Sequence, residues 1–294
     1  MGGSPSAGSR RLSASRPGGC VRPAEADPVG DPVRIVGVRF LNARPLLAGL
    51  EAGIAAQFPY RFEAGEPSLC ADRLAEGNAE AGLVPVAALP VAPEIRALPA
   101  LGVAARHEVR SVLLISRVPL ERVRKLAAHA ASRTSVTLAR LLLAERWGTG
   151  PRVIQCEPPL ERMLQEADAA VIIGDPALAI HGRTNLLEVD LAGAWAEWSG
   201  LPFVFAIWGV GPMAPVGLES LLERSFDYAE ERWGELMPLW AHAHGVGLGE
   251  TRDYLERTLT FRLQDQERAG MQEFLRRAAC AGLLPRRDEV WHAV

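Results

Sequence analysis

A hydroxyl-rich turn at residues 132–135, Ser-Arg-Thr-Ser, runs directly into an amphipathic segment. Leucine and alanine side chains recur along that segment at helical spacing, and its charged residues fall mostly off this face. The first turn of a helix has backbone N–H groups without partners and carries the positive end of the helix dipole. With the hydroxyls of Ser132, Thr134 and Ser135 and the guanidinium of Arg133, it is suited to a carboxylate or a phosphate. The alternative is an ordinary helix cap, because Ser and Thr favour that position in any case.

Two further loops place polar side chains directly after predicted strands. Asn42 and Arg44 follow a strand predicted at residues 33–40, and Asp175 follows one predicted at residues 169–173. Ligands of α/β proteins bind at the carboxyl ends of strands, so we expect these loops to meet the 132–135 turn in a cleft. An acidic group facing an anionic ligand is unfavourable, so Asp175 is also interpreted as a helix cap or as a residue that orients a neighbour. For Asn42 the alternative is an Asn-containing turn.

The elements that must position these loops alternate between strands and helices. Strands are predicted at residues 33–40, 60–63, 81–84, 110–116, 152–156, 169–173 and 201–208, and helices at residues 43–52, 67–76, 135–147, 159–166 and 192–198. This alternation predicts an α/β fold with a mostly parallel sheet. After residue 215 the pattern is helical throughout, with helices expected at residues 218–242, 248–258 and 264–281.

Two strong strands, at residues 110–116 and 203–208, bracket the central segment of the chain. Two α/β lobes joined by two crossing strands form a hinge with a cleft between them. We therefore expect a discontinuous first lobe of residues 33–116 and 208–294, which includes the helical C-terminal region. The second lobe is expected at residues 117–207.

Composition excludes several classes of protein. The 32 basic and 35 acidic residues give a net charge of −3, which does not indicate binding to nucleic acid or to a membrane surface. No apolar run approaches the ~18–20 residues of a membrane span. The four cysteines lie far apart and the six histidines lack metal-ligand spacing, so no metal site is predicted. The oligomeric state is left open.

Residues 1–32 differ in composition from the rest of the chain. They are rich in Gly, Ser, Pro and Arg and poor in large apolar residues, which predicts a disordered N-terminal extension. An export signal needs about 7–15 consecutive apolar residues, and this stretch has none. The interpretation from sequence is therefore a cytoplasmic protein.

Five motifs in order give the chain a specific resemblance. They are residues 40–46 (Phe-Leu-Asn-Ala-Arg-Pro-Leu), 109–116 (Val-Arg-Ser-Val-Leu-Leu-Ile-Ser), 132–135 (Ser-Arg-Thr-Ser), 173–178 (Ile-Gly-Asp-Pro-Ala-Leu) and 200–208 (Gly-Leu-Pro-Phe-Val-Phe-Ala-Ile-Trp). Together they resemble the chorismate dehydratases of the futalosine route to menaquinone. The resemblance is close from about residue 33 to residue 209 and looser in the helical C-terminal third.

The resemblance implies a two-lobed, periplasmic-binding-protein-like fold of type II and a hydro-lyase without a cofactor. Members of the family convert chorismate to 3-[(1-carboxyvinyl)oxy]benzoate by loss of water. Removal of the proton at the ether-bearing carbon and loss of the neighbouring hydroxyl leave an aromatic ring, so the protein mainly orients a dianion and stabilises developing charge. The enolpyruvyl carboxylate of the substrate could itself be the base.

The same resemblance implies roles for individual residues. Asn42 and Ser111 are carried over as catalytic. The substrate-binding residues are expected to be Arg44, Ser132, Arg133, Thr134, Ser135 and Asp175. Four aromatic side chains, Phe40, Phe203, Phe205 and Trp208, are candidates for the wall around the ring, with core packing as the alternative.

Three other functions remain open from the sequence. The first is the sister enzyme of the same pathway, which acts on cyclic dehypoxanthine futalosine. The second is a cytoplasmic small-anion binding protein, because a fold alone does not fix function. The third is the effector domain of a transcription regulator, although no helix-turn-helix is attached. The pair of Asn42 and Ser111 discriminates best between an enzyme and a binder.

Overall fold

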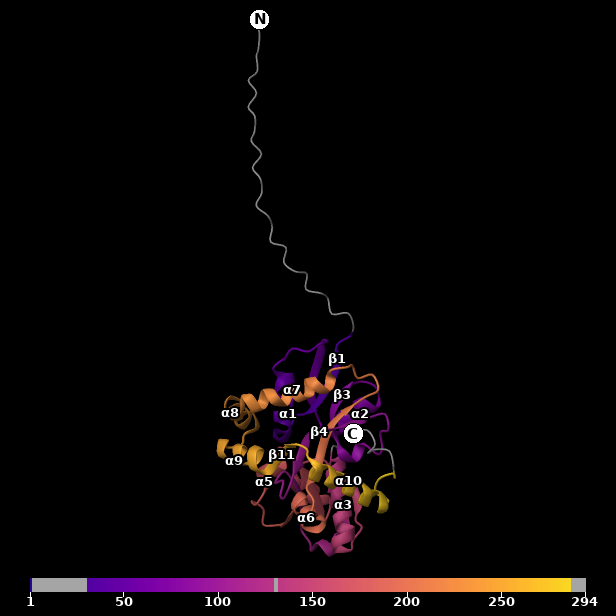
Figure 1. Ribbon diagram of the computed structural model, residues 1–294. Helices are drawn as coiled ribbons and strands as arrows, with labels where there is room; N and C mark the ends of the chain where they lie inside the picture. The colour runs from indigo at the N-terminus through magenta and orange to yellow at the C-terminus, as the bar shows by residue number, and fades with distance from the viewer. Residues whose placement is uncertain (2–30, 130–131, 287–294) are drawn as a thin grey trace. The chain divides into compact units, whose positions relative to one another are not determined.

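The computed structural model describes residues 1, 31–129 and 132–286, and its body contains two β-sheets (Figure 1). The predicted extension 1–32 lies almost entirely outside the described residues. The larger sheet has six strands in the order β11-β4-β10-β3-β1-β2. Their bounds are β1 Val33–Val38, β2 Tyr60–Gly65, β3 Ala81–Pro85, β4 Arg96–Ala105, β10 Phe203–Val210 and β11 Leu259–Arg262. Strands β1, β2 and β3 are parallel, whereas β10 runs antiparallel to β3 and β4.

The smaller sheet has five strands in the order β7-β6-β8-β5-β9. Their bounds are β5 Val112–Ser116, β6 Lys125–Ala128, β7 Arg152–Gln155, β8 Ala169–Ile173 and β9 Leu187–Asp190. Strands β7, β6 and β8 are parallel, and β5 is antiparallel to both β8 and β9. Both sheets are therefore mixed, because β10 in the larger sheet and β5 in the smaller one run against the parallel strands beside them.

The chain crosses between the sheets through two short connections, at residues 106–111 and 200–202. The strand expected to cross at residues 110–116 is β5 and lies wholly in the smaller sheet, whereas β10 lies wholly in the larger one. We therefore propose lobe boundaries at the connections themselves instead of at residues 116 and 207.

Five of the six helices described in the first two-thirds of the chain follow the predicted positions closely, and for the helix that begins at Asp175 no range was predicted. The six are α1 Arg44–Glu51, α2 Pro67–Ala75, α3 Arg133–Trp147, α4 Leu160–Glu166, α5 Asp175–Ile180 and α6 Leu191–Ser199. Helix α3 buries Leu138, Ala139, Leu142 and Leu143 completely. It ends at Gly148, whose positive φ of 63° closes the helix in the left-handed conformation that glycine adopts without strain.

The C-terminal third corrects two expectations. The single helix expected at 218–242 is divided into α7 Leu218–Glu231 and α8 Trp233–His244, because Arg232 leaves the helical conformation between them, with φ −115° and ψ 20°. The region is also not helical throughout. After α9 Leu248–Asp253 and a π-helical turn at Tyr254–Thr258, strand β11 pairs with β4 before α10 Asp265–Cys280.

The C-terminal helices pack on helices of both lobes and on the larger sheet. Helix α7 packs along α1, and the two lie side by side in Figure 1. The Ser225 hydroxyl of α7 donates to the carbonyl of Leu46 and accepts from the amide of Leu50, which fixes this contact. Helix α10 contacts β10 and also α3, so the last helix joins elements of the two sheets.

Candidate functional site

A small cavity of about 60 Å³ lies where the carboxyl ends of strands from both sheets meet. The larger sheet contributes Val38, Leu83, Pro85, Val103, Phe205 and Ala206, and the smaller sheet contributes Val112 and Ile173. Phe40, Asn42, Ala43, Pro67, Gly174 and residues 132–135 complete the lining. The three loops that the sequence predicted to meet in a cleft do converge here.

The amino end of α3 forms one wall of this cavity. The Ser132 side chain is buried, and its hydroxyl has no hydrogen-bond partner among the described residues. The Thr134 hydroxyl accepts a hydrogen bond of 3.1 Å from the backbone N–H of Ala87, and Arg133 pairs with Asp72 at 2.6 Å. Because the Ser132 hydroxyl is buried and unpaired beside free helix N–H groups, this end of the cavity favours a ligand with acceptor oxygens.

Asn42 lines the opposite wall, on a 3₁₀ turn of residues Leu41–Ala43. Asp175 holds this turn from the other sheet, because its carboxylate accepts a hydrogen bond of 2.9 Å from the backbone N–H of Leu41. The second carboxylate oxygen of Asp175 lies 2.7 Å from Nδ1 of His244. Asp175 thus orients the Asn42 turn and does not itself line the cavity.

Ser111 lies behind the cavity wall and is 1 % exposed. Its carbonyl accepts a hydrogen bond of 2.8 Å from the backbone N–H of Gly174, and its hydroxyl lies 2.6 Å from the hydroxyl of Tyr254. The next residue, Val112, does line the cavity. Tyr254 was not predicted from the sequence, because nothing near it in sequence marks a site. Its π-helical turn is the one local signal, since such turns recur at functional sites.

Arg44 lies outside the cavity lining. Its guanidinium pairs with the carboxylate of Glu51 within the same helix, α1. Burial raises the pKa of Glu51, and the neighbouring Arg44 opposes that rise. Among the described lining residues, Arg133 therefore supplies the guanidinium nearest to a bound anion.

Two of the four candidate aromatic residues face the cavity. Phe40 and Phe205 line it, whereas Phe203 packs edge-on against Trp195 and Phe274 in the core. Trp208 is buried away from the cavity. The ring of Phe40 lies directly over Gly174, where a Cβ atom would come within 2.6 Å of it.

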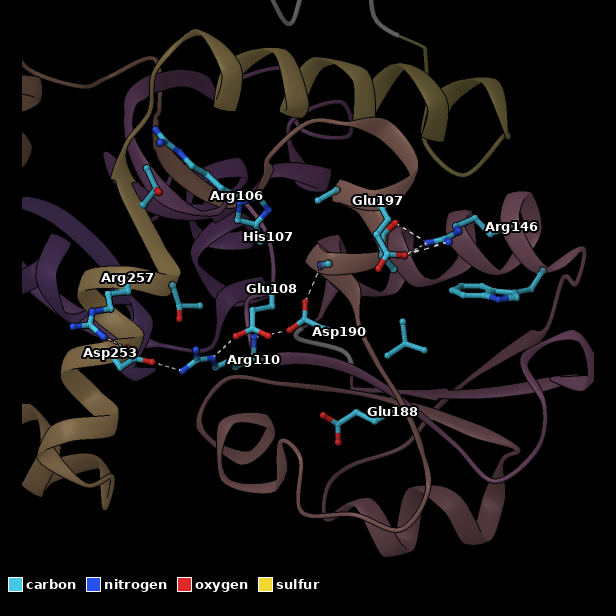
Figure 2. Close-up of a pocket in the computed structure, with 17 residues that line it drawn as sticks. Arg106, His107, Glu108, Arg110, Arg146, Glu188, Asp190, Glu197, Asp253 and Arg257 are labelled. Carbon is cyan, nitrogen blue, oxygen red and sulfur yellow. Dashed lines mark hydrogen bonds and ion pairs between the residues drawn. The ribbon is translucent and has the colours of Figure 1, made fainter.

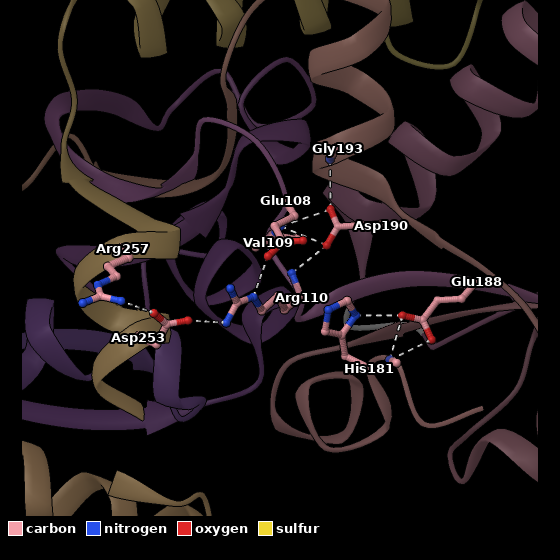
Figure 3. Close-up of polar contacts among 10 residues, drawn as sticks. Glu108, Val109, Arg110, His181, Glu188, Asp190, Gly193, Asp253 and Arg257 are labelled. Carbon is pink, nitrogen blue, oxygen red and sulfur yellow. Dashed lines mark hydrogen bonds and ion pairs between the residues drawn. The ribbon is translucent and has the colours of Figure 1, made fainter. Parts of the chain in front are cut away.

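A half-buried carboxylate holds the connection at residues 106–111 (Figure 3). Asp190 accepts hydrogen bonds from the backbone N–H groups of Val109, Arg110 and Gly193 at 2.6–3.1 Å. Burial raises the pKa of Asp190, and these three N–H groups oppose the rise. Arg110 has a φ of +61°, a conformation that non-glycine residues rarely adopt, so this anchor holds a strained residue next to Ser111.

A larger hollow of about 1070 Å³ lies beside the same connection (Figure 2). Its arginines are already ion-paired: Arg106 with Glu267, Arg110 with Glu108 and Asp253, Arg146 with Glu197, and Arg257 with Asp253. Because these charges compensate one another, the hollow offers an anion little field. The small cavity, with its unpaired hydroxyl and helix N-terminus, is the better candidate site.

Within the described ranges, no group of three or more His, Cys, Asp or Glu side chains is arranged to hold a metal ion. A helix long and apolar enough to cross a membrane is likewise absent from the described part of the chain.

The fold and the interlobe cavity define a protein with the periplasmic-binding-protein fold. A crystal structure of an Archaeoglobus fulgidus protein covers 86 % of this chain and 98 % of its own, at a TM-score of 0.71 and 14 % identity. A Candida albicans protein described as exhibiting the generic periplasmic binding protein structural fold covers 88 % and 93 %, at 0.61 and 11 %. The type of fold expected from the sequence is confirmed.

The chain belongs to the menaquinone biosynthesis family, whose model matches residues 33–280. A chorismate dehydratase of Thermus thermophilus is 31 % identical over 196 residues, which are 60 % of this chain and 71 % of the relative. A chorismate dehydratase of Campylobacter jejuni is 26 % identical over 125 residues, which are 42 % of this chain and 54 % of that relative. The family expected from the five motifs is therefore confirmed.

Proposed function

We propose that this protein is a chorismate dehydratase, a hydro-lyase that converts chorismate to 3-[(1-carboxyvinyl)oxy]benzoate and water. Two curated relatives with this activity support the proposal. The structural observation that carries it is the buried, unpaired hydroxyl of Ser132 at the amino end of α3, inside a cavity lined from both lobes. That end suits a carboxylate, and the substrate has two.

The charges of the cavity suit a dianion. Within the described lining, the polar side chains are hydroxyls, an amide and one guanidinium, and none is acidic. Both oxygens of the Asp175 carboxylate are already engaged, by the N–H of Leu41 and by His244. The site therefore presents hydrogen-bond donors to the substrate, with negative charge held behind the wall.

The proposed roles follow from these positions. Ser132, Thr134 and Ser135 hold one carboxylate at the helix terminus. Arg133 lies on the same turn, where its ion pair with Asp72 offsets part of its charge. Asn42 hydrogen-bonds the substrate from the opposite wall. The enolpyruvyl carboxylate takes the proton from the ether-bearing carbon, the neighbouring C–O bond breaks, and the hydroxyl leaves with a proton as water. Ser111 lies just behind the lining in the described conformation, next to Val112. We propose that, when the lobes close on the substrate, its hydroxyl donates a hydrogen bond to the leaving oxygen.

Substrate entry requires the lobes to separate. Ligand pockets have volumes of about 300–1,000 Å³, whereas this cavity measures about 60 Å³. We infer that the described conformation is closed and that opening at the two connections admits the substrate. Small-angle scattering with and without a non-reacting dicarboxylate analogue tests this step, and an unchanged radius of gyration would count against it.

The proposal is tested by mixing the purified protein with chorismate and following the products by liquid chromatography with mass detection. We expect an aromatic product lighter by one water, formed by the wild type and lost in Asn42→Ala and Ser111→Ala. If chorismate stays intact beside a boiled-protein control, the sister substrate is tested next and then the binding-protein interpretation. A cytoplasmic location goes with this proposal and stays a prediction.

A further inference from the structure

Tyr254 connects the two residues proposed to act on the substrate. It lies in the π-helical turn that follows α9, more than 140 positions from Ser111 in sequence, and its side chain is 1 % exposed. Its hydroxyl donates a hydrogen bond of 2.6 Å to the hydroxyl of Ser111. The side chain of Asn42 lies near enough to the phenol to lower its pKa, against the larger effect of burial. Three segments that are distant in sequence thus come together around the Tyr254 phenol.

The direction of these hydrogen bonds determines what Ser111 can do. A serine hydroxyl has one hydrogen to donate and two lone pairs that accept. Because Tyr254 donates to Ser111, the hydrogen of Ser111 remains available for another acceptor. Burial raises the pKa of Tyr254 far above its usual value, so the phenol stays protonated and keeps donating. A donor behind Ser111 also polarises its O–H bond.

The neighbouring residues hold this contact in register (Figure 3). Asp253, which precedes Tyr254, pairs at 2.7 Å with Arg110, which precedes Ser111. The same guanidinium pairs with Glu108 at 2.7 Å, and the backbone of Arg110 is bound by Asp190. Two adjacent residues of one segment therefore contact two adjacent residues of the other. The ion pair and the hydroxyl pair each constrain where the Ser111 oxygen lies.

We propose that Tyr254 is a positioning residue for the dehydration: it fixes the orientation of the Ser111 hydroxyl from behind the cavity wall. This inference rests on the proposed function. The Tyr254 hydroxyl donates its hydrogen to Ser111 and lies outside the cavity lining, so Tyr254 acts through Ser111 and not on the substrate itself.

The first test compares Tyr254→Phe with the wild type in steady-state turnover of chorismate. Loss of the phenol hydrogen bond should lower kcat about 10- to 100-fold, because small misplacement of a catalytic group has effects of this size. KM should change less than threefold, since Tyr254 makes no contact with the cavity. Tyr60→Phe is the matched control, because it also removes a phenol hydroxyl, in this case a partly buried one that donates to the carbonyl of Ile54.

The second test asks whether the effect passes through Ser111. In the double variant Ser111→Ala/Tyr254→Phe, kcat should equal that of Ser111→Ala alone, because the phenol then has no hydroxyl to orient. Multiplicative losses in the double variant would overturn the role assigned here. A Tyr254→Phe variant with kcat within twofold of the wild type would overturn it as well.

A further measurement covers the case in which Tyr254→Phe does not fold. The chain has three tyrosines, so a Tyr60→Phe/Tyr228→Phe background leaves Tyr254 alone for replacement by 3-fluorotyrosine. This keeps the hydroxyl and makes it a stronger donor, so kcat should shift at least twofold against the unlabelled background, and an unchanged kcat would refute the proposal. A wild type that does not dehydrate chorismate overturns the proposed function and this inference together. An active wild type with an unaffected Tyr254→Phe overturns only the inference.

Discussion

Gly174 allows the two lobes to approach each other, and Gly174→Ala should separate closure from folding. Gly174 has φ 69° and ψ −150°, a region that is almost exclusive to glycine. An added Cβ would lie 2.6–2.8 Å from three atoms of the Phe40 ring, which belongs to the opposite lobe. The substitution therefore has two free-energy costs: strain in the backbone of residue 174, and a clash at the contact between the lobes.

The two costs act on different equilibria. The backbone cost, about 1–3 kcal/mol, is present in the open and the closed states alike, so it lowers only the free energy of unfolding. The clash with Phe40 costs a similar amount, about 1–3 kcal/mol for overpacking, but only when the lobes are closed. A closure penalty of this size weakens ligand binding by about 5- to 150-fold.

Equilibrium binding of a dicarboxylate analogue and urea unfolding measure the two costs separately. Gly148→Ala is the matched control, because Gly148 also has a positive φ but a Cβ there meets no atom within 4 Å. This control should lower stability and leave binding unchanged. In a Phe40→Ala background, the Gly174→Ala substitution should reduce the affinity for the analogue less than it does in the wild type. Equal affinities for Gly174→Ala and the wild type would refute the argument that closure brings these two residues together.

Three further predictions concern single side chains. Ser132→Ala should leave the free energy of unfolding unchanged or raise it, because it removes a buried unpaired hydroxyl. The same substitution should weaken binding of the analogue about tenfold or more, since a hydrogen bond to a charged group is worth about 1.5–3 kcal/mol. A less stable variant with intact binding would contradict this prediction. Asp190→Asn should lower the free energy of unfolding by roughly 2–4 kcal/mol in urea titrations, because one or two buried N–H groups lose their acceptor; a loss below about 0.5 kcal/mol would argue against an anchoring role. Arg276 and Arg277 lower the pKa of Glu273 to about 2, so the stability from this cluster is present above pH 4.5 and is lost as the pH falls toward 2. Glu273→Gln should make the melting temperature less dependent on pH across that window. An unaltered pH profile would exclude the effect.

Local sequence patterns predicted most of the strands and helices that position the site. The amphipathic run of α3 and the apolar run of β8 are each bounded by clear signals, such as Gly148 after the helix. Strand β4 was not predicted, because its first half is only partly buried, contains Pro99 and does not alternate between buried and exposed residues. Its pairing with β10 comes from contacts distant in sequence, which a local pattern cannot reveal.

In the candidate site, too, some residues could be predicted from local sequence, whereas others depend on tertiary contacts. The loop residues Asn42 and Ser132 could be found from their position after a strand and before a helix, and both line the cavity. Arg44 was expected to face the ligand, but the pairing with Glu51 one helix length away could not be read from a motif. Tyr254 could not be found at all, because its role depends on a tertiary contact with Ser111.

The placement of charge bears on how a binding-protein fold would perform a dehydration. Within the described lining, the cavity has hydrogen-bond donors and no acid, so it orients a dianion but offers no carboxylate as a base. A binder of small anions could share all of these features. A binder does not need a buried phenol that an adjacent ion pair holds against a serine hydroxyl, beside a residue with a strained backbone. This arrangement improves no contact with a ground-state ligand. The Ser111–Tyr254 pair is therefore the feature of this structure that favours an enzyme over a binder.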